Sequence, residues 1–208
     1  MFALVESGNI TKMMIGNKGI TIGDNQYPAA IFTIWTESER NAIGIYTIEI
    51  DNTNLKDEDW YINTSITYSY DSSANKVKGA YGTATAIAHA DTKWTQAQID
   101  DPSLVGQAPA GADTNTVRIE GLKTKLIRDV KKKAQSQLNI TDWYITRKAE
   151  KDTAIPSSIT THRDAVRAKQ AEMETAITNA SDTPALETLY ARNSEGVRPI
   201  GDIPQLED

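Results

Sequence analysis

The side chains that could perform chemistry do not stand at the spacings that catalysis or metal binding requires. Neither His89 nor His162 has a second histidine or a glutamate at the steps typical of zinc ligands. The acidic run at 57–59 (DED) lacks the alternating ligands and closing glutamate of a calcium loop, and GNKG at 16–19 lacks the pattern of a phosphate-binding loop. The chain has no cysteine, which excludes thiol catalysis, thiolate ligands and disulfides. We therefore predict no catalytic residue, no cofactor and no metal, and we expect a protein that is not an enzyme.

Two adjacent aromatic residues, Trp143 and Tyr144, are better suited to binding a partner protein. Both are predicted on a short helix, which cannot turn two neighbouring large side chains inward, so one is free to anchor a partner. The basic run from Arg128 to Lys133 (RDVKKK) is interpreted as a solvated helix face, with contact to an acidic partner as the alternative.

Two long amphipathic helices must position these residues. The first is predicted from apolar residues that recur at steps of three and four: Ile119, Leu122, Leu126, Val130, Ala134 and Leu138. The second has one face made of Ile159, His162, Val166, Gln170, Met173 and Ile177. Packing of the two stripes against each other predicts a helical hairpin. Because the stripes are narrow, self-association between copies is the alternative.

A short helix is predicted between the two long ones. The predicted segment runs from Thr141 through Lys151. Thr141 is expected to cap its start at Asp142, and Ile155-Pro156 is expected to prevent its continuation, because the residue before a proline avoids the helical conformation. Ser157 or Ser158 is expected to cap the second long helix. Trp143 and Ile155 are predicted to plug the closed end of the hairpin.

This region also resembles a known family. The pattern L-x-x-T-D-W-Y, then R-K-A-E with I-P, then R-x-A-V-R, falls on Leu138, Thr141, Asp142, Trp143, Tyr144, Arg147, Lys148, Ala149, Glu150, Ile155, Pro156, Arg163, Ala165, Val166 and Arg167. It is similar to the carboxy-terminal region of tailed-bacteriophage tail-assembly chaperones and tail-fibre-assembly proteins, and it covers about the third quarter of the chain. Lys151-Asp152 stands where related sequences often have a glycine, and His162 where an aromatic residue is common.

The amino-terminal half is predicted to be a small, mostly antiparallel β domain. The first fifteen residues have the pattern of a hairpin, and Thr36 with Glu39 has capping-box spacing. The clearest predicted strand alternates from Trp60 to Tyr70, and it returns through Val77, Gly79 and Tyr81. Its aromatic residues Trp60, Tyr68 and Tyr70 are assigned to the core rather than to a sugar-binding platform.

This half resembles the opening domain of small phage tail proteins at the level of pattern. The matching residues are Phe2, Leu4, Val5, Gly8, Ile10, Thr11, Lys12, Gln26, Tyr27, Pro28, Glu39, Arg40, Ala42, Ile43, Gly44, Ile45 and Tyr46. Two resemblances to tail proteins in one chain support each other.

Composition and length set the remaining expectations. A chain of 208 residues with net charge −6 and 39 % hydrophobic residues gives no reason to expect nucleic-acid binding. Nowhere do about 18 apolar residues follow one another, and the amino terminus lacks a secretory pattern, so no membrane is expected. The expected location is the cytoplasm of the host bacterium during assembly, with the virion tail as the alternative.

We therefore predict an α+β fold in four parts. These are a β-rich domain at 1–100, a Pro/Gly/Ala linker at 101–117, a helical hairpin domain at 118–192 and an extended tail at 193–208. The resemblance implies a chaperone-like protein that binds a phage tail or tail-fibre polypeptide, and a structural virion subunit is the alternative. The predicted partner-binding residues are Trp143, Tyr144, Arg147, Ile155, Pro156, Arg163 and Arg167.

Overall fold

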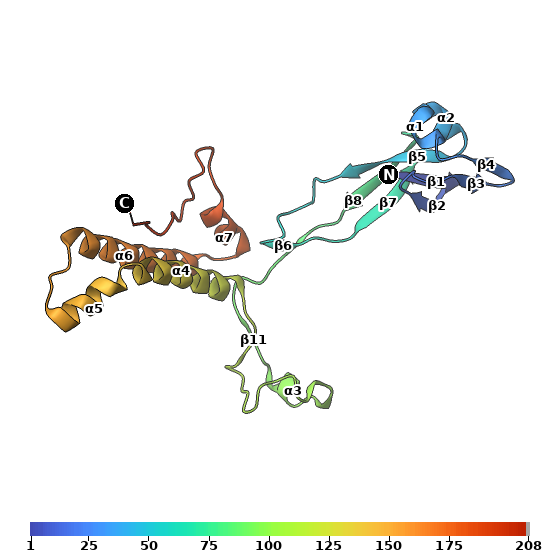
Figure 1. Cartoon of the computed structure of the whole chain (residues 1–208). Coiled ribbons are helices and arrows are strands. Elements are labelled where there is room, and N and C mark those ends of the chain that lie inside the picture. The colour runs from blue at the N-terminus through green and yellow to red at the C-terminus, as the bar shows by residue number, and fades with distance from the viewer. Residues whose placement is uncertain (207–208) are drawn as a thin grey trace. The chain divides into compact units, whose positions relative to one another are not determined.

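The structure, a computed structural model, describes residues 1–206, and the chain divides into two compact units. Met1–Thr85 holds the main β-sheet, and Ala86–Asp208 holds the long helices (Figure 1). The predicted α+β fold is confirmed. The boundary lies at 85/86, about fifteen residues before the predicted end of the first domain at 100.

The first unit is built on a five-stranded sheet with the order β2-β1-β5-β8-β7. The pairing is antiparallel except between β5 and β8, and Cα atoms of the outer strands β2 and β7 approach within 8 Å of one another, so the sheet curls. The predicted first hairpin is confirmed, with Ser7 and Gly8 both at positive φ in its two-residue turn. The strands of the sheet are β1 (Phe2–Glu6), β2 (Asn9–Met14), β5 (Ile45–Asp51), β7 (Ile66–Asp71) and β8 (Lys76–Tyr81).

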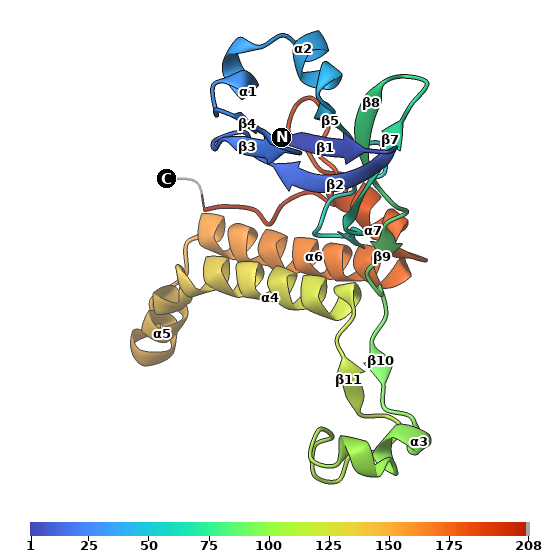
Figure 2. The same cartoon turned by 90° about the vertical axis from the view of Figure 1, so that its right-hand side faces the viewer.

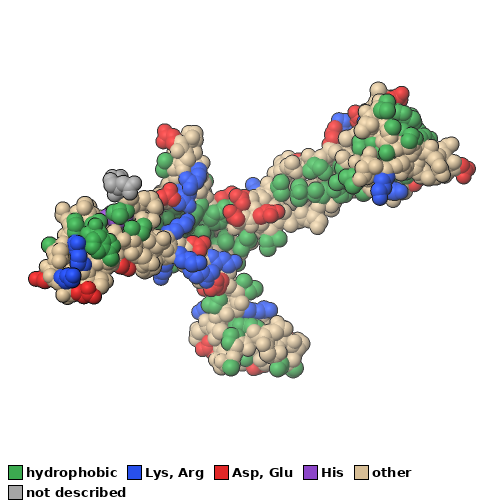
Figure 3. All heavy atoms as spheres, viewed as in Figure 1, with side chains coloured by type: hydrophobic (Ala, Val, Ile, Leu, Met, Phe, Trp, Pro, Cys, Tyr) green, Lys and Arg blue, Asp and Glu red, His purple; other side chains and the backbone are tan. Residues whose placement is uncertain are grey.

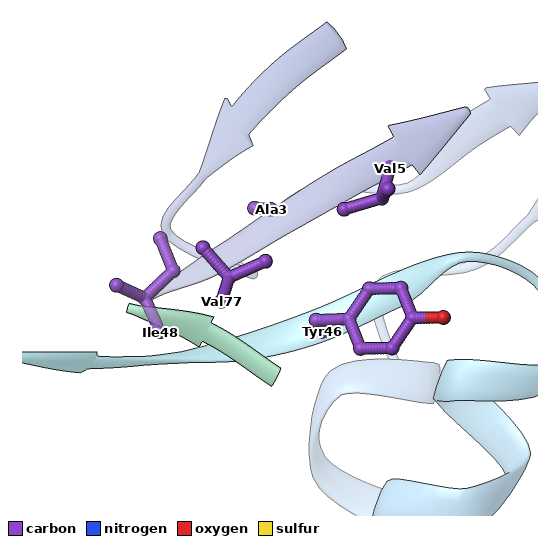
Figure 4. Close-up of a cluster of buried hydrophobic side chains, with 5 residues drawn as sticks. All are labelled: Ala3, Val5, Tyr46, Ile48 and Val77. Atoms are coloured by element: carbon purple, nitrogen blue, oxygen red, sulfur yellow. The ribbon is translucent and has the colours of Figure 1, made fainter. Parts of the chain in front are cut away.

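Apolar residues are buried on both faces of the sheet. One face gathers Ala3, Val5, Tyr46, Ile48 and Val77, which Figure 4 draws as sticks. The other face places Leu4 and Ile45 against Ile20, Ile31 and Phe32. This second face is covered by β3 (Ile20–Ile22), β4 (Asn25–Tyr27) and α1 (Ile31–Ile34). The short helix α2 (Glu37–Ala42) begins with the capping box predicted for Thr36 and Glu39.

The predicted long strand from Trp60 to Tyr70 is instead two strands, β6 (Tyr61–Ile62) and β7. Asn63 exchanges two hydrogen bonds with the backbone of Lys56, and the Thr64 hydroxyl accepts one from Gly82 N, so side chains replace the strand ladder there. Trp60 is buried as predicted, whereas Ile62 and Tyr68 are exposed.

The predicted linker lies within a two-stranded arm of the second unit. Strand β10 (Thr92–Lys93) pairs with β11 (Val117–Ile119), so the two ends of the segment between them lie side by side. The intervening segment holds α3 (Gln96–Ile99), which Thr95 caps, and a 3-10 turn at Pro102–Leu104 (η1). Ile119, expected on the first long helix, is an exposed strand residue in this arm.

The second unit contains the predicted helical hairpin. Helix α4 (Leu122–Asn139) packs along α6 (Ser157–Asn179), with α5 (Asp142–Lys151) between them in sequence and α7 (Thr183–Tyr190) after them (Figures 1 and 2). Asp91 accepts a hydrogen bond from Gly121 N at the start of α4, and this bond, together with one from Thr124, holds the pKa of Asp91 below its ordinary value. The buried residues of α4 and α6 are Leu122, Val130, Ala134, Ile159, Arg163, Val166, Met173 and Ile177.

Helix α5 ends at Lys151 as predicted, but the capping bonds predicted for Thr141 and for Ser157 or Ser158 are wrong. The Thr141 side chain makes no capping bond to α5, because its hydroxyl donates backwards to Leu138 O. After Lys151, the last residue of α5, Asp152 adopts φ 52 and ends the helix four residues before Pro156. Left-handed backbone of this kind suits glycine best. Pro156 precedes α6 directly, and neither Ser157 nor Ser158 caps it.

The predicted extended tail folds back onto its own unit. Ile200 and Ile203 are 3 % and 5 % exposed, and Ile200 N donates to Leu189 O of α7. Gln205 bonds the side chain of Gln137 on α4. The last part of that prediction, residues 207–208, lies outside the described residues. The tail therefore contributes Ile200 and Ile203 to the core of the second unit.

Candidate partner-binding site on helix α5

Among the described helices of eight or more residues in the second unit, α5 is the one that buries no side chain. It has ten residues and none of them is buried. Trp143 is 51 % exposed and Ile145 is 42 % exposed. Isolated helices shorter than about 12–15 residues are marginal in water, so α5 depends on contacts outside itself. In both views α5 diverges from the α4–α6 pair, and hydrophobic side chains gather on that end of the unit in Figure 3.

Trp143, Tyr144 and Arg147 form one cluster on α5. The rings of Trp143 and Tyr144 lie 3.8 Å apart between centroids, tilted by 34°. The Arg147 guanidinium carbon lies 4.7 Å from the Trp143 ring centroid and 5.3 Å from that of Tyr144. Such cation–π contacts fix the long arginine side chain across the aromatic surface. The three residues thus present a preorganised surface that is apolar and positively charged.

Arg163 of α6 holds the start of α5 in place. Its Nη1 donates to Leu138 O at 2.8 Å, to Thr141 Oγ1 at 2.7 Å and to Asp142 Oδ1 at 2.8 Å. Both Arg163 and Thr141 are buried, whereas the Asp142 side chain is half exposed. Hydrogen bonds to a charged donor are among the stronger polar interactions in proteins. This clamp joins the corner between α4 and α5 to α6.

The structure brings only some of the predicted partner-binding residues together. Trp143, Tyr144 and Arg147 form the cluster, but Arg163 is 8 % exposed and its Nη1 is bonded inside the unit. The expectation that Arg163 offers a binding surface is therefore wrong, and so is the expectation that Trp143 plugs the hairpin.

The other three predicted residues lie outside this cluster of contacts. Arg167 is exposed and pairs with Asp164 on its own helix at 3.5 Å. Ile155 is partly buried in the loop after α5, and Pro156 is exposed at the start of α6.

Two exposed isoleucines in this region were not among the predicted partner-binding residues. Ile140 at the corner after α4 is 52 % exposed, and Ile145 follows the aromatic pair. Neither falls on a buried helical stripe, and an apolar residue outside such a stripe is the signal that could have identified both.

Within residues 1–206, no three acidic or histidine side chains are grouped so that they could hold a metal ion. None of the described helices has the length and hydrophobicity needed to span a bilayer. In the basic run, Arg128 binds Glu120 at 2.8 Å and Lys131 lies 3.7 Å from Glu174, as expected of a solvated face.

Comparisons of the chain with protein-family models, curated protein sequences and solved structures find no match.

Proposed function

We propose that this protein is a non-enzymatic binding protein of phage tail morphogenesis, similar in role to a tail-fibre-assembly chaperone. The observation that supports binding most directly is α5, a helix with no buried residue and an ordered Trp143–Tyr144–Arg147 cluster. Aromatic residues and arginine dominate the binding energy of protein interfaces. The assignment to phage tails rests on the resemblance of the sequence patterns.

The proposed mechanism is stoichiometric. The protein binds a tail or tail-fibre polypeptide through α5 and covers apolar or strand-edge surface until that polypeptide oligomerises or docks. Exposed strand edges and apolar segments aggregate readily before assembly, so covering them during that interval favours correct assembly. The Arg163 clamp suits this role because it fixes the corner from which α5 projects.

A structural virion subunit, such as a small fibre, adaptor or baseplate component, is the second candidate. The division of the chain favours it, because each compact unit has a core of its own. One unit could then attach to the particle while the other binds a neighbouring subunit.

Mass spectrometry of salt-washed particles of the parent phage tests these two roles. Copy number is calibrated against the major capsid protein, and particles made without this protein are compared. A released chaperone is absent from wild-type particles, yet its loss leaves particles without fibres. Presence at a fixed multiple of three or six supports the structural subunit. Normal, infectious particles in the absence of the protein contradict both roles.

A further inference from the structure

The end of the chain lies across the two long helices of the second unit. Figure 2 shows it running back along α6 after α7. Gly201 comes so close to Lys169 of α6 that a Cβ atom built on the glycine would stand 2.7 Å from the lysine Cε. Gln205 then accepts a hydrogen bond at 2.9 Å from the side chain of Gln137 on α4. Residues 200–206, here called the docked segment, therefore contact both helices.

Side chains, rather than a ladder of backbone hydrogen bonds, hold the docked segment. Residues 201–206 form neither helix nor strand. Ile200 and Ile203 are both buried, and within residues 1–206 the backbone bond from Ile200 N to Leu189 O joins the segment to α7. Burial of two aliphatic side chains is a contact that any peptide with the same spacing can supply. The docked segment is therefore a peptide ligand by its chemistry, although it is covalently part of the chain.

The docked segment fills this surface incompletely. Its Gln205 lines a cavity of about 310 Å³ against α4 and another of about 410 Å³ against α6. The walls of the two cavities, here called the C-terminal groove, include Lys133 and Gln137 of α4 and Thr161 and His162 of α6. Gln137 Oε1 and His162 Nε2 are buried, yet neither has a hydrogen-bond partner within residues 1–206. Because an unpaired buried polar atom costs free energy, a ligand that pairs both atoms would bind more tightly than the docked segment.

We propose that the C-terminal groove binds a peptide of another polypeptide, and that the docked segment is the internal occupant that this peptide displaces. The partner peptide has the chemistry of the occupant, IGDIPQL: two aliphatic side chains three positions apart and no positive charge. Lys133 lines the groove, and none of the α4 and α6 residues that line the two cavities is acidic, so a cationic peptide is disfavoured. The groove shares no residue with the cluster on α5 and does not depend on the proposed function.

The segment of a second copy is a weaker candidate for the occupant. It is identical to the docked segment, so it would leave the same cavities and the same two atoms, Gln137 Oε1 and His162 Nε2, unpaired. A different peptide gains over the docked segment by filling the cavities and pairing these atoms. Such a gain is needed, because a short linker gives a tethered occupant an effective concentration on the order of 1 mM.

Cutting the connection to α7 tests the groove. Residues 191–197 are exposed, so a protease recognition sequence placed after Ser194 of the full chain lies outside the groove. Anisotropy measures binding of the fluorescein-labelled peptide PIGDIPQL, residues 199–206, before and after cleavage, and circular dichroism at 222 nm reports whether the helices persist. We expect the cut chain to bind this peptide at least about tenfold more tightly than the uncut chain. The same peptide with serine at both isoleucine positions should not bind.

A library of eight-residue peptides that compete with the labelled peptide on the cut chain tests whether a better occupant exists. We expect the strongest competitors to keep aliphatic residues three positions apart. They should exceed PIGDIPQL at least about tenfold, because they fill the cavities and pair the two buried atoms. Competitors no stronger than PIGDIPQL would overturn the proposal of a foreign peptide, because the groove would then be matched to its own segment.

Two further outcomes overturn the site. Loss of the helices on cleavage, or failure of the labelled peptide to bind a cut chain that keeps them, would make the docked segment a fixed part of the core. A dimer of the uncut chain in light scattering that dissociates on cleavage would assign the groove to the segment of a second copy.

Charge reversal at neighbouring lysines of α4 tests the charge of the partner peptide. Lys133 lines the groove, whereas Lys132 lines neither cavity. In the cut chain, Lys133→Glu is expected to weaken binding of PIGDIPQL about fivefold, because Asp202 lines the same cavity. Lys132→Glu makes the same change of charge outside the groove and should alter the affinity less than about twofold. Equal losses from the two substitutions would contradict the charge assigned to the partner.

Discussion

Arg163 is the single residue on which the geometry of the candidate site depends most. Replacing its guanidinium removes three hydrogen bonds at once, to the Leu138 carbonyl, the buried Thr141 hydroxyl and the Asp142 carboxylate. Arg163→Ala should lower the free energy of unfolding of the second unit by about 2–3 kcal/mol. Urea unfolding followed by circular dichroism at 222 nm measures this, because the long helices belong to that unit.

Arg167→Ala is the matched control, one turn along the same helix. Its side chain is exposed and has only the loose ion pair with Asp164, so stability should change by less than about 0.5 kcal/mol. Similar effects of the two substitutions would show that the Arg163 clamp is not structural.

Asp71 gives a prediction about acid in the first unit. The Ser73 hydroxyl, then Ala74 N and Ser73 N, donate to its carboxylate, and these bonds lower its pKa to about 2. Because the pKa is lower in the folded state than in the unfolded chain, this stabilisation is complete above about pH 4 and is lost as pH falls through 2. Carboxyl-carbon NMR should record the titration near pH 2, and Ser73→Ala should move it upward. A midpoint near 4 in the wild-type protein would contradict the bonded turn.

At the scale of elements, the end of α5 is strained at Asp152. A non-glycine residue at φ 52 stores energy that glycine does not. Asp152→Gly should therefore raise the stability of the second unit by about 0.5–1 kcal/mol, even though it removes an exposed ion pair with Lys148. Thermal unfolding measures the change. Lys151→Gly, inside the helix, should act in the opposite direction, and stabilisation by both variants would contradict the assigned helix end.

The long helices were predictable because their apolar residues repeat regularly, but the clamp between them was not. Val130, Ala134, Val166 and Met173 are buried as the stripes predict. Arg163 also lies on the buried face, yet a charged residue is ordinarily assigned to the surface. The acceptors that allow its burial belong to Leu138, Thr141 and Asp142, which lie 21 to 25 positions away in the sequence.

At the scale of the whole chain, contacts between residues distant in sequence determine the structure of two segments that local composition mispredicts. The segment around Pro102 and Gly106 has the composition of a linker, but β10 and β11 pair on either side of it and make it part of an arm. The tail after Asn193 likewise has turn residues that suggest an extended end. Ile200 and Ile203 are nonetheless buried within the second unit.

Packing of the tail should contribute measurably to the stability of the second unit. Ile203→Ala should destabilise the second unit by about 2–4 kcal/mol, because it removes a side chain that is 5 % exposed. Val197→Ala, at an exposed position of the same tail, should stay within about 0.5 kcal/mol of the wild type. Urea unfolding of both variants provides the comparison, and a neutral Ile203→Ala would indicate that the tail is not docked in solution.

The most direct test of the central claim, that α5 is the element a partner completes, is amide hydrogen exchange of the full chain, alone and with the tail polypeptide bound. With no buried residue, α5 should exchange far faster than α4 and α6 in the free protein. Binding should then slow the exchange of α5 at least tenfold. Protection of α5 in the free protein equal to that of α4 and α6, or exchange that binding leaves unchanged, would contradict the claim.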